Sequence, residues 1–219
     1  MNSVRAVFWD MDGTLIDTEQ LHYEVIRDWC ADHGFALTEQ ANENLLGKTM
    51  PEKWDLLRPN LPADADFEHF GKWCAREYMG RLDISMRRDD TVAVVRELAA
   101  QGVAQACVSN GDAEVVRTNL RIIGVESCMD FFISGRDAPR GKPHADPYLA
   151  AARRAGLAPE HCLAVEDSLV GLTAARAAGC VVCAWPLHMD SLLCAPDEPL
   201  PAADFAIRKP DDFPHHLLD

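Results

Sequence analysis

The chain has 219 residues, of which 48% are hydrophobic and 26% are charged, and this composition is typical of a soluble globular protein with a sizeable core. Its formal net charge of −14 argues against nucleic acid or an anionic membrane surface as a partner, because both attract clusters of lysine and arginine. No hydrophobic run approaches the roughly 18 residues of a membrane span, so we expect a cytoplasmic monomer or small homo-oligomer.

The first predicted strand ends in carboxylates, a glycine and a hydroxyl. The apolar run over residues 6–9 is typical of a parallel strand buried on both faces, and Asp10, Asp12, Gly13 and Thr14 follow it. In an ideal strand both carboxylates would lie on one face, where like charges need a cation between them. Gly13 would let the backbone approach an anion, and Thr14 offers a hydroxyl.

Helices without a convincing strand among them follow this segment. The first is predicted to begin at Asp17-Thr18-Glu19, where a capping residue precedes an acid, and to end at His33-Gly34. Three more are predicted over residues 39–46, 51–57 and 66–79, separated by Gly47, Pro59 and Pro62. Helices placed between one strand and the next form an inserted domain, expected over residues 17–85, with residues 1–16 and 86–219 as the core domain.

From about Thr91 onward, helices and strands alternate. The pattern predicts helices over residues 92–100, 113–123, 146–155 and 168–178, and strands over residues 104–108, 131–134, 163–165 and 181–184. Repeated strand-helix units indicate an α/β fold with a parallel, right-handed, doubly wound sheet. The tail is expected to add an edge strand at residues 205–207 and a short helix near His215. The eight cysteines are spread over long spacings, so free buried thiols are expected.

Polar segments follow several of these strands, at the edge where open α/β sheets bind ligands. They are Ser109-Asn110-Gly111, Lys142-Pro143 and Glu166-Asp167-Ser168. A hydroxyl, an amide and an ammonium can bind the oxygens of a phosphoryl group, and Lys142 also offsets the carboxylates. Repulsion among Asp10, Asp12, Glu166 and Asp167 would be prohibitive without a cation, and an all-oxygen ligand set suits Mg²⁺.

The segment Asp10-Met11-Asp12-Gly13-Thr14-Leu15 resembles the nucleophile motif of the haloacid dehalogenase superfamily. Ser109-Asn110, Lys142-Pro143 and Glu166-Asp167-Ser168, followed by Gly171 and Ala178-Gly179, resemble its other motifs in the same order. The resemblance implies a Rossmann-like core with a helical cap between the first two motifs. Dehalogenases of this superfamily lack an acid at the position of Asp12, whereas its phosphatases and phosphomutases have one.

The resemblance and the chemistry together assign roles to these residues. Asp10 is the expected nucleophile, forming an aspartyl phosphate, and Asp12 is the expected general acid and base. The resemblance implies Mg²⁺ ligation by the Asp10 carboxylate, the Asp12 carbonyl and Asp167, with Glu166 binding directly or through water. Lys142 and Ser109 complete the catalytic set, and the expected substrate-binding residues are Gly13, Thr14, Asn110, Gly111, Glu19, His22 and Lys48.

Substrate choice is expected to come from the inserted helices, because the core contacts only the phosphoryl group. Relatives place a histidine and a basic residue or amide at positions that match His22 and Lys48. A packed helix residue is the alternative for His22, and a solvated loop residue for Lys48. The chain departs from the family at Arg88-Asp89-Asp90-Thr91, where relatives usually have a Pro-Gly turn after the cap.

The function predicted from the sequence is that of a Mg²⁺-dependent phosphatase acting on a small phosphorylated metabolite, with sugar phosphates as the favoured class. A phosphomutase of the β-phosphoglucomutase kind is the first alternative, and phosphonoacetaldehyde hydrolysis through a cap lysine is a weaker one. A phospho-receiver signalling module would lack the helical insert. A calcium loop would need a glutamate at its twelfth position, which is Leu21 when counted from Asp10.

Overall fold

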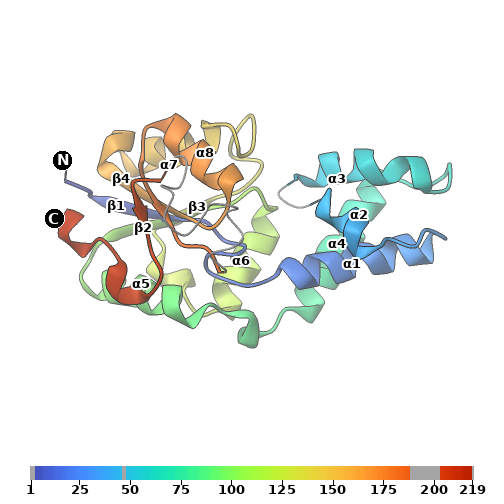
Figure 1. Ribbon diagram of the computed structural model, residues 1–219, viewed down its shortest axis with the longest axis horizontal. Helices are drawn as coiled ribbons and strands as arrows, with labels where there is room; N and C mark the ends of the chain where they lie inside the picture. The colour runs from blue at the N-terminus through green and yellow to red at the C-terminus, as the bar shows by residue number, and fades with distance from the viewer. Residues whose placement is uncertain (1–2, 46–47, 188–202, 219) are drawn as a thin grey trace. The chain divides into compact units, whose positions relative to one another are not determined.

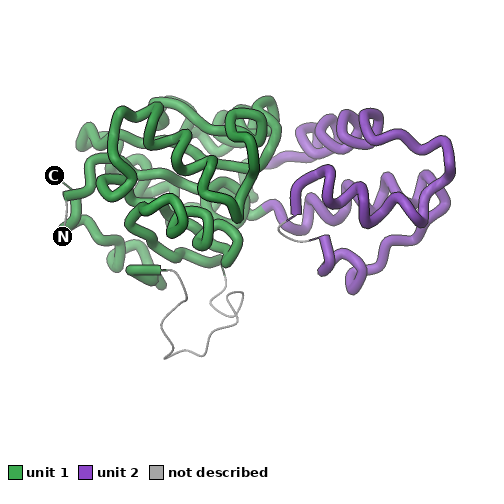
Figure 2. Tube along the Cα trace, turned by 90° about the horizontal axis from the view of Figure 1, so that it is seen from above, with its two compact units in different colours: residues 1–17, 84–219 green, residues 18–83 purple. Residues whose placement is uncertain are grey.

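The computed structural model of the protein describes residues 3–45, 48–187 and 203–218 (Figure 1). The chain forms two compact units, one of residues 1–17 and 84–219 and the other of residues 18–83 (Figure 2). Gly47 and Cys194 lie outside the described residues. The seven cysteines within them are free, as predicted. No helix in the described part of the chain is long and apolar enough to cross a membrane.

A six-stranded sheet forms the centre of the first unit, and every neighbouring pair of strands in it is parallel. Its order is β3-β2-β1-β4-β5-β6, where the strands are β1 (Ala6–Trp9), β2 (Ala104–Val108), β3 (Phe131–Ile133), β4 (Cys162–Glu166), β5 (Val181–Ala184) and β6 (Phe205–Ala206). The order runs outward in both directions from β1, so the carboxyl end of β1 is the switch point at which such sheets bind ligands. This topology confirms the predicted doubly wound sheet.

Strand register brings the polar segments to one level of the sheet. Trp9 at the end of β1 lies opposite Cys107 of β2 and Val165 of β4. The residues one step further along are Asp10, Val108 and Glu166. Asp10 therefore emerges from the sheet beside the last residues of both neighbouring strands.

Helices cover both faces of this sheet, with α7 (Asp146–Ala155) and α8 (Leu169–Ala178) on one side and α5 (Asp89–Ala100) and α6 (Ala113–Ile122) on the other (Figure 1). Alternate residues of β1 serve the two faces. Phe8 belongs to the core cluster that includes Tyr148, Ala151 and Leu172 of α7 and α8. Trp9 donates its indole N–H to Gln105 at 2.9 Å and stacks on Phe213 of the C-terminal segment.

The second unit contains the helices α1 (Glu19–Asp32), α2 (Glu39–Glu43), α3 (Met50–Leu57) and α4 (Phe67–Arg81). Trp29 of α1 contacts the edge of Phe70 of α4 at a centroid distance of 5.5 Å, and Arg81 pairs with Asp28 at 2.6 Å. The inserted helical unit is thus confirmed as part of the fold. The domain limits drawn from the sequence, residues 17–85, enclose the compact unit of residues 18–83.

Helix starts differ from the sequence prediction in two places. Thr18 occupies the N-cap of α1 but makes no capping bond to the helix backbone. Ala145, not Asp146, is the N-cap of α7, because Asp146 already has helical geometry at the first position and its carboxylate pairs with Arg140 at 2.9 Å. Both differences are local and leave the positions of the two helices unchanged.

Candidate active site at the carboxyl edge of the sheet

Strand β1 ends at Trp9, and the chain then makes a tight turn that carries the two aspartates. The Asp10 N–H donates to Val165 O at 3.0 Å, which fixes Asp10 to β4. The Met11 carbonyl accepts N–H groups from residues 14–16 at 2.8 to 3.3 Å, and Gly13 adopts a φ of 84°, which favours glycine. The two aspartates are therefore joined by a turn, and the strand geometry expected for them from the sequence is wrong.

Lys142 lies at the centre of the charged groups. Its side chain is 4% exposed, and its ammonium donates to Asp10 Oδ1 at 2.5 Å, to Glu166 Oε1 at 2.6 Å and to Val108 O at 2.7 Å. One cation therefore links the ends of β1, β2 and β4. Charge-assisted hydrogen bonds of this kind are stronger than neutral ones, so Lys142 orients both carboxylates.

Among the described residues, Asp10, Glu166 and Asp167 form a group of carboxylates whose ligand atoms lie within 4.8 Å of one another. Glu166 Oε2 is buried and has no hydrogen-bond partner within the described part of the chain. A buried carboxylate oxygen without a donor is costly, and a hard cation such as Mg²⁺ is the partner that an all-oxygen group would take. The residues present therefore fit a magnesium ion bound by these three carboxylates.

Electrostatics support the same conclusion. Burial raises the pKa of Asp10, although Lys142 opposes this shift. Burial and the charge of Asp10 raise the pKa of Glu166 to about 7, and burial with both neighbouring carboxylates raises that of Asp167 well above its usual range. Burial alone would lower the pKa of Lys142, but the charges of Asp10 and Glu166 outweigh it and raise that pKa. The three carboxylates carry more negative charge than Lys142 alone can balance. A divalent cation would therefore stabilise their ionised form.

Two further side chains hold the carboxylates in place. Tyr148 of α7 is fully buried, and its hydroxyl donates to Glu166 Oε1. Burial, together with the charge of Glu166, raises the pKa of Tyr148 far above its usual value, so the hydroxyl keeps its proton at neutral pH. Thr14 is also fully buried and donates to Asp167 Oδ1 at 3.3 Å. The sequence predicted a substrate contact for Thr14, whereas the observed contact orients a carboxylate.

Asn110 makes two hydrogen bonds to the backbone of Lys142. Its Oδ1 accepts the Lys142 N–H at 2.8 Å, and its amide donates to Lys142 O at 3.2 Å. The side chain predicted to bind phosphoryl oxygens is therefore committed to the loop that carries the lysine. Ser109 Oγ accepts the Gly111 N–H at 3.0 Å, and both residues lie directly after β2, as predicted.

Tyr148 was not recognised in the sequence as a site residue. Its aromatic ring lies among the apolar residues of α7, a pattern that is equally typical of core packing. The only sequence signal for Tyr148 is its position six residues after Lys142. That spacing becomes informative only when the fold brings Glu166 within hydrogen-bonding distance of Tyr148.

The predicted cap residues all belong to the second unit. Glu19 is the first residue of α1, and His22 on the same helix stacks on Tyr78 of α4 at a centroid distance of 4.5 Å. Lys48 is exposed and directly precedes Thr49, the N-cap of α3. Their contacts with a substrate stay predictions.

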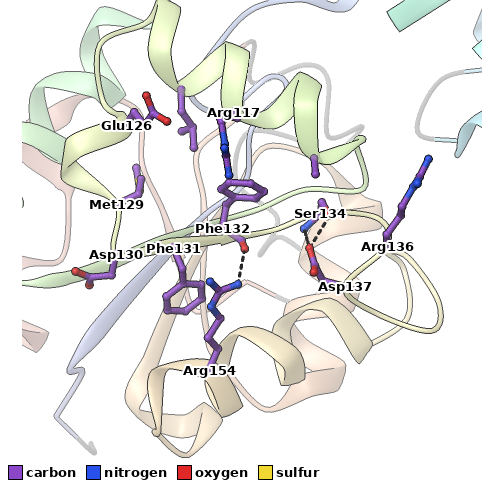
Figure 3. A pocket seen from close by; sticks show the side chains of 12 residues that line it. Arg117, Glu126, Met129, Asp130, Phe131, Phe132, Ser134, Arg136, Asp137 and Arg154 are labelled. Carbon is purple, nitrogen blue, oxygen red and sulfur yellow. Dashed lines mark hydrogen bonds between the residues drawn. The ribbon is translucent and has the colours of Figure 1, made fainter. Parts of the chain in front are cut away.

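A separate hollow of about 500 Å³ lies along the edge strand β3 (Figure 3). Arg154 donates to the Phe132 carbonyl at 3.3 Å, and Arg117 lies over the Phe132 ring. None of the candidate site residues lines this hollow. The two arginines cover exposed groups of an edge strand, an arrangement that discourages the addition of another strand.

Gly171, the third residue of α8, leaves the space that Glu166 occupies. A Cβ atom at this position would lie 1.9 Å from Glu166 Oε2, a distance that forces the carboxylate to move. Gly171→Ala is therefore expected to destabilise the protein by about 1 to 3 kcal/mol through overpacking. It should also raise the Mg²⁺ concentration needed for half-maximal activity. Chemical unfolding and magnesium titration measure the two effects.

Gly80→Ala is the matched control, because Gly80 lies in α4 and a Cβ there would meet no atom within 4 Å. Alanine at such a helical position should stabilise the protein by about 0.5 to 1 kcal/mol. Equal shifts in the free energy of unfolding for both variants would contradict the close contact between Gly171 and Glu166.

Comparisons with known proteins identify the family of this chain. The chain matches the family model of the haloacid dehalogenase-like hydrolases over residues 4–179. It is 28% identical over 182 residues to hexitol phosphatase A of Escherichia coli (strain K12), covering 82% of this chain and 82% of that protein. It is also 28% identical over 201 residues to a phosphoglycolate phosphatase of Shigella boydii (serotype 4, strain Sb227), covering 81% of this chain and 79% of that protein.

Solved structures give the same fold. A variant of CbbY from Rhodobacter sphaeroides, crystallised with xylulose-(1,5)-bisphosphate, superimposes with a TM-score of 0.83 at 23% identity and covers 99% of both chains. At that identity the likeness shows the fold alone. The family match extends over most of the sequence and includes every polar segment at the carboxyl edge of the sheet. The chain therefore belongs to the haloacid dehalogenase-like hydrolases and is an enzyme of that family.

Proposed function

We propose that this enzyme is a Mg²⁺-dependent phosphatase that hydrolyses a small phosphorylated metabolite of the sugar phosphate class through an aspartyl-phosphate intermediate on Asp10. The observation that carries the proposal is the bonding of one buried ammonium, Lys142, to Asp10 and Glu166 beside the third carboxylate, Asp167. A phosphoryl group needs a nucleophile in line and neutralisation of its oxygen charges, and this group of residues offers both. The names of the phosphatase relatives support the substrate class.

The carboxylates of Asp10, Glu166 and Asp167 would hold Mg²⁺, and the family resemblance implies the Asp12 carbonyl as a further ligand. When bound, the ion neutralises charge on the phosphoryl oxygens and on the carboxylates. Lys142 keeps Asp10 oriented at the carboxyl edge of the sheet. Because Asp10 is held from the β4 side as well, through its own N–H, its carboxylate is preorganised for attack.

The reaction proceeds in two displacements. Asp10 attacks phosphorus, the bond to the leaving oxygen breaks, and Asp12 gives that oxygen its proton. Water then attacks the phosphorus of the aspartyl phosphate, Asp12 takes a proton from this water, and inorganic phosphate leaves with the Asp10 carboxylate restored. Asp12 follows Asp10 by two residues across the turn, and its charge contributes to the raised pKa of Asp10, which supports an acid close to the nucleophile.

Phosphate release from a panel of hexose, pentose and hexitol phosphates and phosphoglycolate, with Mg²⁺ and with a chelator, tests the proposal. We expect release from at least one sugar phosphate in Mg²⁺ and none after chelation. Isomerisation of a hexose 1-phosphate without net release would instead indicate a phosphomutase. A folded protein that releases no phosphate from any compound, including an activated aryl phosphate, would overturn the proposed function.

The role of Asp12 predicts a dependence on the leaving group. Asp12→Ala should reduce turnover of an alkyl phosphate by about 10²- to 10⁴-fold, because its leaving oxygen needs a proton. An aryl phosphate, whose leaving oxygen hardly needs one, should lose far less. The ratio of kcat values for the two substrates measures the effect. An equal loss on both substrates would contradict the acid role of Asp12.

A further inference from the structure

Residues at the start of α5 hold the turn that carries the aspartates through its backbone carbonyls. Three consecutive carbonyls of this turn each accept a hydrogen bond from there. Arg88 Nη1 donates to Gly13 O at 2.7 Å, Thr91 Oγ1 donates to Thr14 O at 2.8 Å, and the Arg88 N–H donates to Leu15 O at 3.1 Å. Every carbonyl from residue 13 to residue 15 is therefore held by Arg88 or Thr91.

The guanidinium of Arg88 is buried and is bonded mainly to backbone carbonyls. Its side chain is 4% exposed, and Nη1 donates to Trp185 O at 2.9 Å in addition to Gly13 O. The guanidinium also lies 5.8 Å from the centre of the Trp185 ring, and Nη2 pairs with Asp90, whose side chain is 38% exposed. Within the described part of the chain the guanidinium has one ion pair, with Asp90, and its other hydrogen bonds join backbone carbonyls that follow β1 and β5.

The same turn also lies against Asp167, because a Cβ atom at Gly13 would lie 2.1 Å from Asp167 Oδ2 and Thr14 donates to the same carboxylate. Its N–H groups at residues 14–16 all point to the Met11 carbonyl, and a peptide unit is planar, so the Asp12 N–H points away from that carbonyl. Gly13 has no side chain to restrict rotation, and its φ of 84° is one of several backbone conformations open to glycine. The hydrogen bonds to the carbonyls of residues 13–15 therefore add to those that the Met11 carbonyl accepts within the turn.

We propose that Arg88 is a positioning residue that fixes the turn of residues 10–15 and thereby sets the rate of the chemical step but not the binding of the substrate. It touches neither carboxylate of the turn and acts through the Gly13 carbonyl. Thr91 serves the same turn through the Thr14 carbonyl, and Thr14 in turn orients Asp167. This inference rests on the proposed phosphatase function for its kinetic test, while its structural test is independent of any activity.

The kinetic test compares Arg88→Met with Arg87→Met, using p-nitrophenyl phosphate as substrate and inorganic phosphate as inhibitor. Arg87 is the matched control, because its guanidinium pairs with Asp89, which is 80% exposed. Arg88→Met should lower kcat by about 10²-fold, the cost of a displacement of about 1 Å at a reacting group. KM and the inhibition constant of phosphate should change by no more than about threefold. Arg87→Met should match the wild type in all three constants.

The structural test is hydrogen exchange of the segment of residues 10–16. In Arg88→Met the amides of residues 14–16 should exchange at least about tenfold faster, while segments in β2 and β4 exchange as in the wild type. If Arg88→Met does not fold, Arg88→Lys and Thr91→Val replace it. Each of these substitutions removes some of the hydrogen bonds to the turn and introduces a side chain close in size to the original one. Each of these variants should also lower kcat and speed the exchange of the amides of residues 14–16, but by less than expected for Arg88→Met.

The outcomes are distinguishable. A wild-type protein that releases no phosphate from p-nitrophenyl phosphate or from any compound of the sugar phosphate panel defeats the proposed function, and hydrogen exchange then decides the role of Arg88 alone. Folded Arg88 variants with wild-type kcat, or with unchanged exchange in residues 10–16, would overturn the positioning role. A fall in melting temperature with unchanged kcat would show that Arg88 only stabilises the fold.

Discussion

Replacing Asp10 with asparagine is expected to reduce phosphate release to the background rate while the protein stays folded. The amide keeps the shape of the side chain and can still accept a hydrogen bond from Lys142, which lies 2.5 Å from Asp10 Oδ1. It lacks the negative charge that attacks phosphorus. Loss of a nucleophile in an acyl-transfer enzyme costs on the order of 10⁶-fold in kcat, which indicates the scale of the effect.

The stereochemistry at phosphorus tests the role of Asp10 directly, with a thiophosphate monoester made chiral by oxygen isotopes as substrate. Two displacements by the wild type should release thiophosphate with net retention of configuration, because each displacement inverts phosphorus once. Net inversion would show a single, direct attack by water. The melting temperature of Asp10→Asn in chelator should not fall, because burial already opposes ionisation of Asp10 by raising its pKa.

Replacing Lys142 with methionine is expected to affect both stability and catalysis. Methionine fills much of the same volume but leaves Asp10, Glu166 and the Val108 carbonyl without the ammonium that now bonds all of them. Removal of one partner from a buried charged group costs about 3 to 5 kcal/mol. Loss of a donor that stabilises developing charge should lower kcat by about 10²- to 10³-fold. Urea unfolding in chelator and steady-state kinetics in Mg²⁺ measure the two effects.

The loss of stability in Lys142→Met should grow with pH. Glu166 has an ordinary pKa of 4.5 and a folded-state pKa of about 7, so its contribution to stability is present below pH 4.5 and is lost as the pH rises toward 7. Without the ammonium its pKa rises further, because Lys142 now lowers it. The difference in free energy of unfolding between variant and wild type should therefore be larger at about pH 8 than at about pH 5.

Lys72→Met is the control for this series. Lys72 forms an ion pair with Glu68, but both side chains are about three-quarters exposed, and such pairs contribute little. Its substitution should leave stability nearly unchanged at both pH values. An equal loss for Lys142→Met at the two pH values would contradict the buried charge balance at the carboxyl edge of the sheet.

Much of the fold can be read from the sequence, because the signals involved are local. Apolar runs such as Ala6–Trp9 form buried strands. After Thr91 such runs alternate with segments of helical periodicity, and this alternation predicts a parallel sheet. The same reasoning places Asp10, Ser109 and Glu166 after their strands. Parallel strands bring their carboxyl ends to one edge, so the sequence also predicts that these residues meet.

The sequence could not predict the contacts that orient these groups. Arg88 bonds Gly13 and Trp185, which are 75 and 97 residues away along the chain, and Asn110 holds the backbone of Lys142 across 32 residues. Tyr148 reaches Glu166 from a helix whose pattern is that of ordinary core packing. Each of these bonds needs two elements packed at a particular distance and a side chain in one rotamer. Periodicity and composition describe only neighbours along the chain, so they give neither the packing distance between two elements nor the rotamer of a side chain.

The sequence by itself therefore determined the order of the elements, the family resemblance and the identity of the carboxylates and the lysine, because each depends on residue type and local spacing. Only the tertiary structure decided what Thr14 and Asn110 contact, that Glu166 Oε2 lacks a hydrogen-bond partner within the described residues, and that Arg88 grips the turn. The physical reason is that hydrogen bonding and burial are properties of distance in space, which the chain acquires only when its sheet and helices pack together.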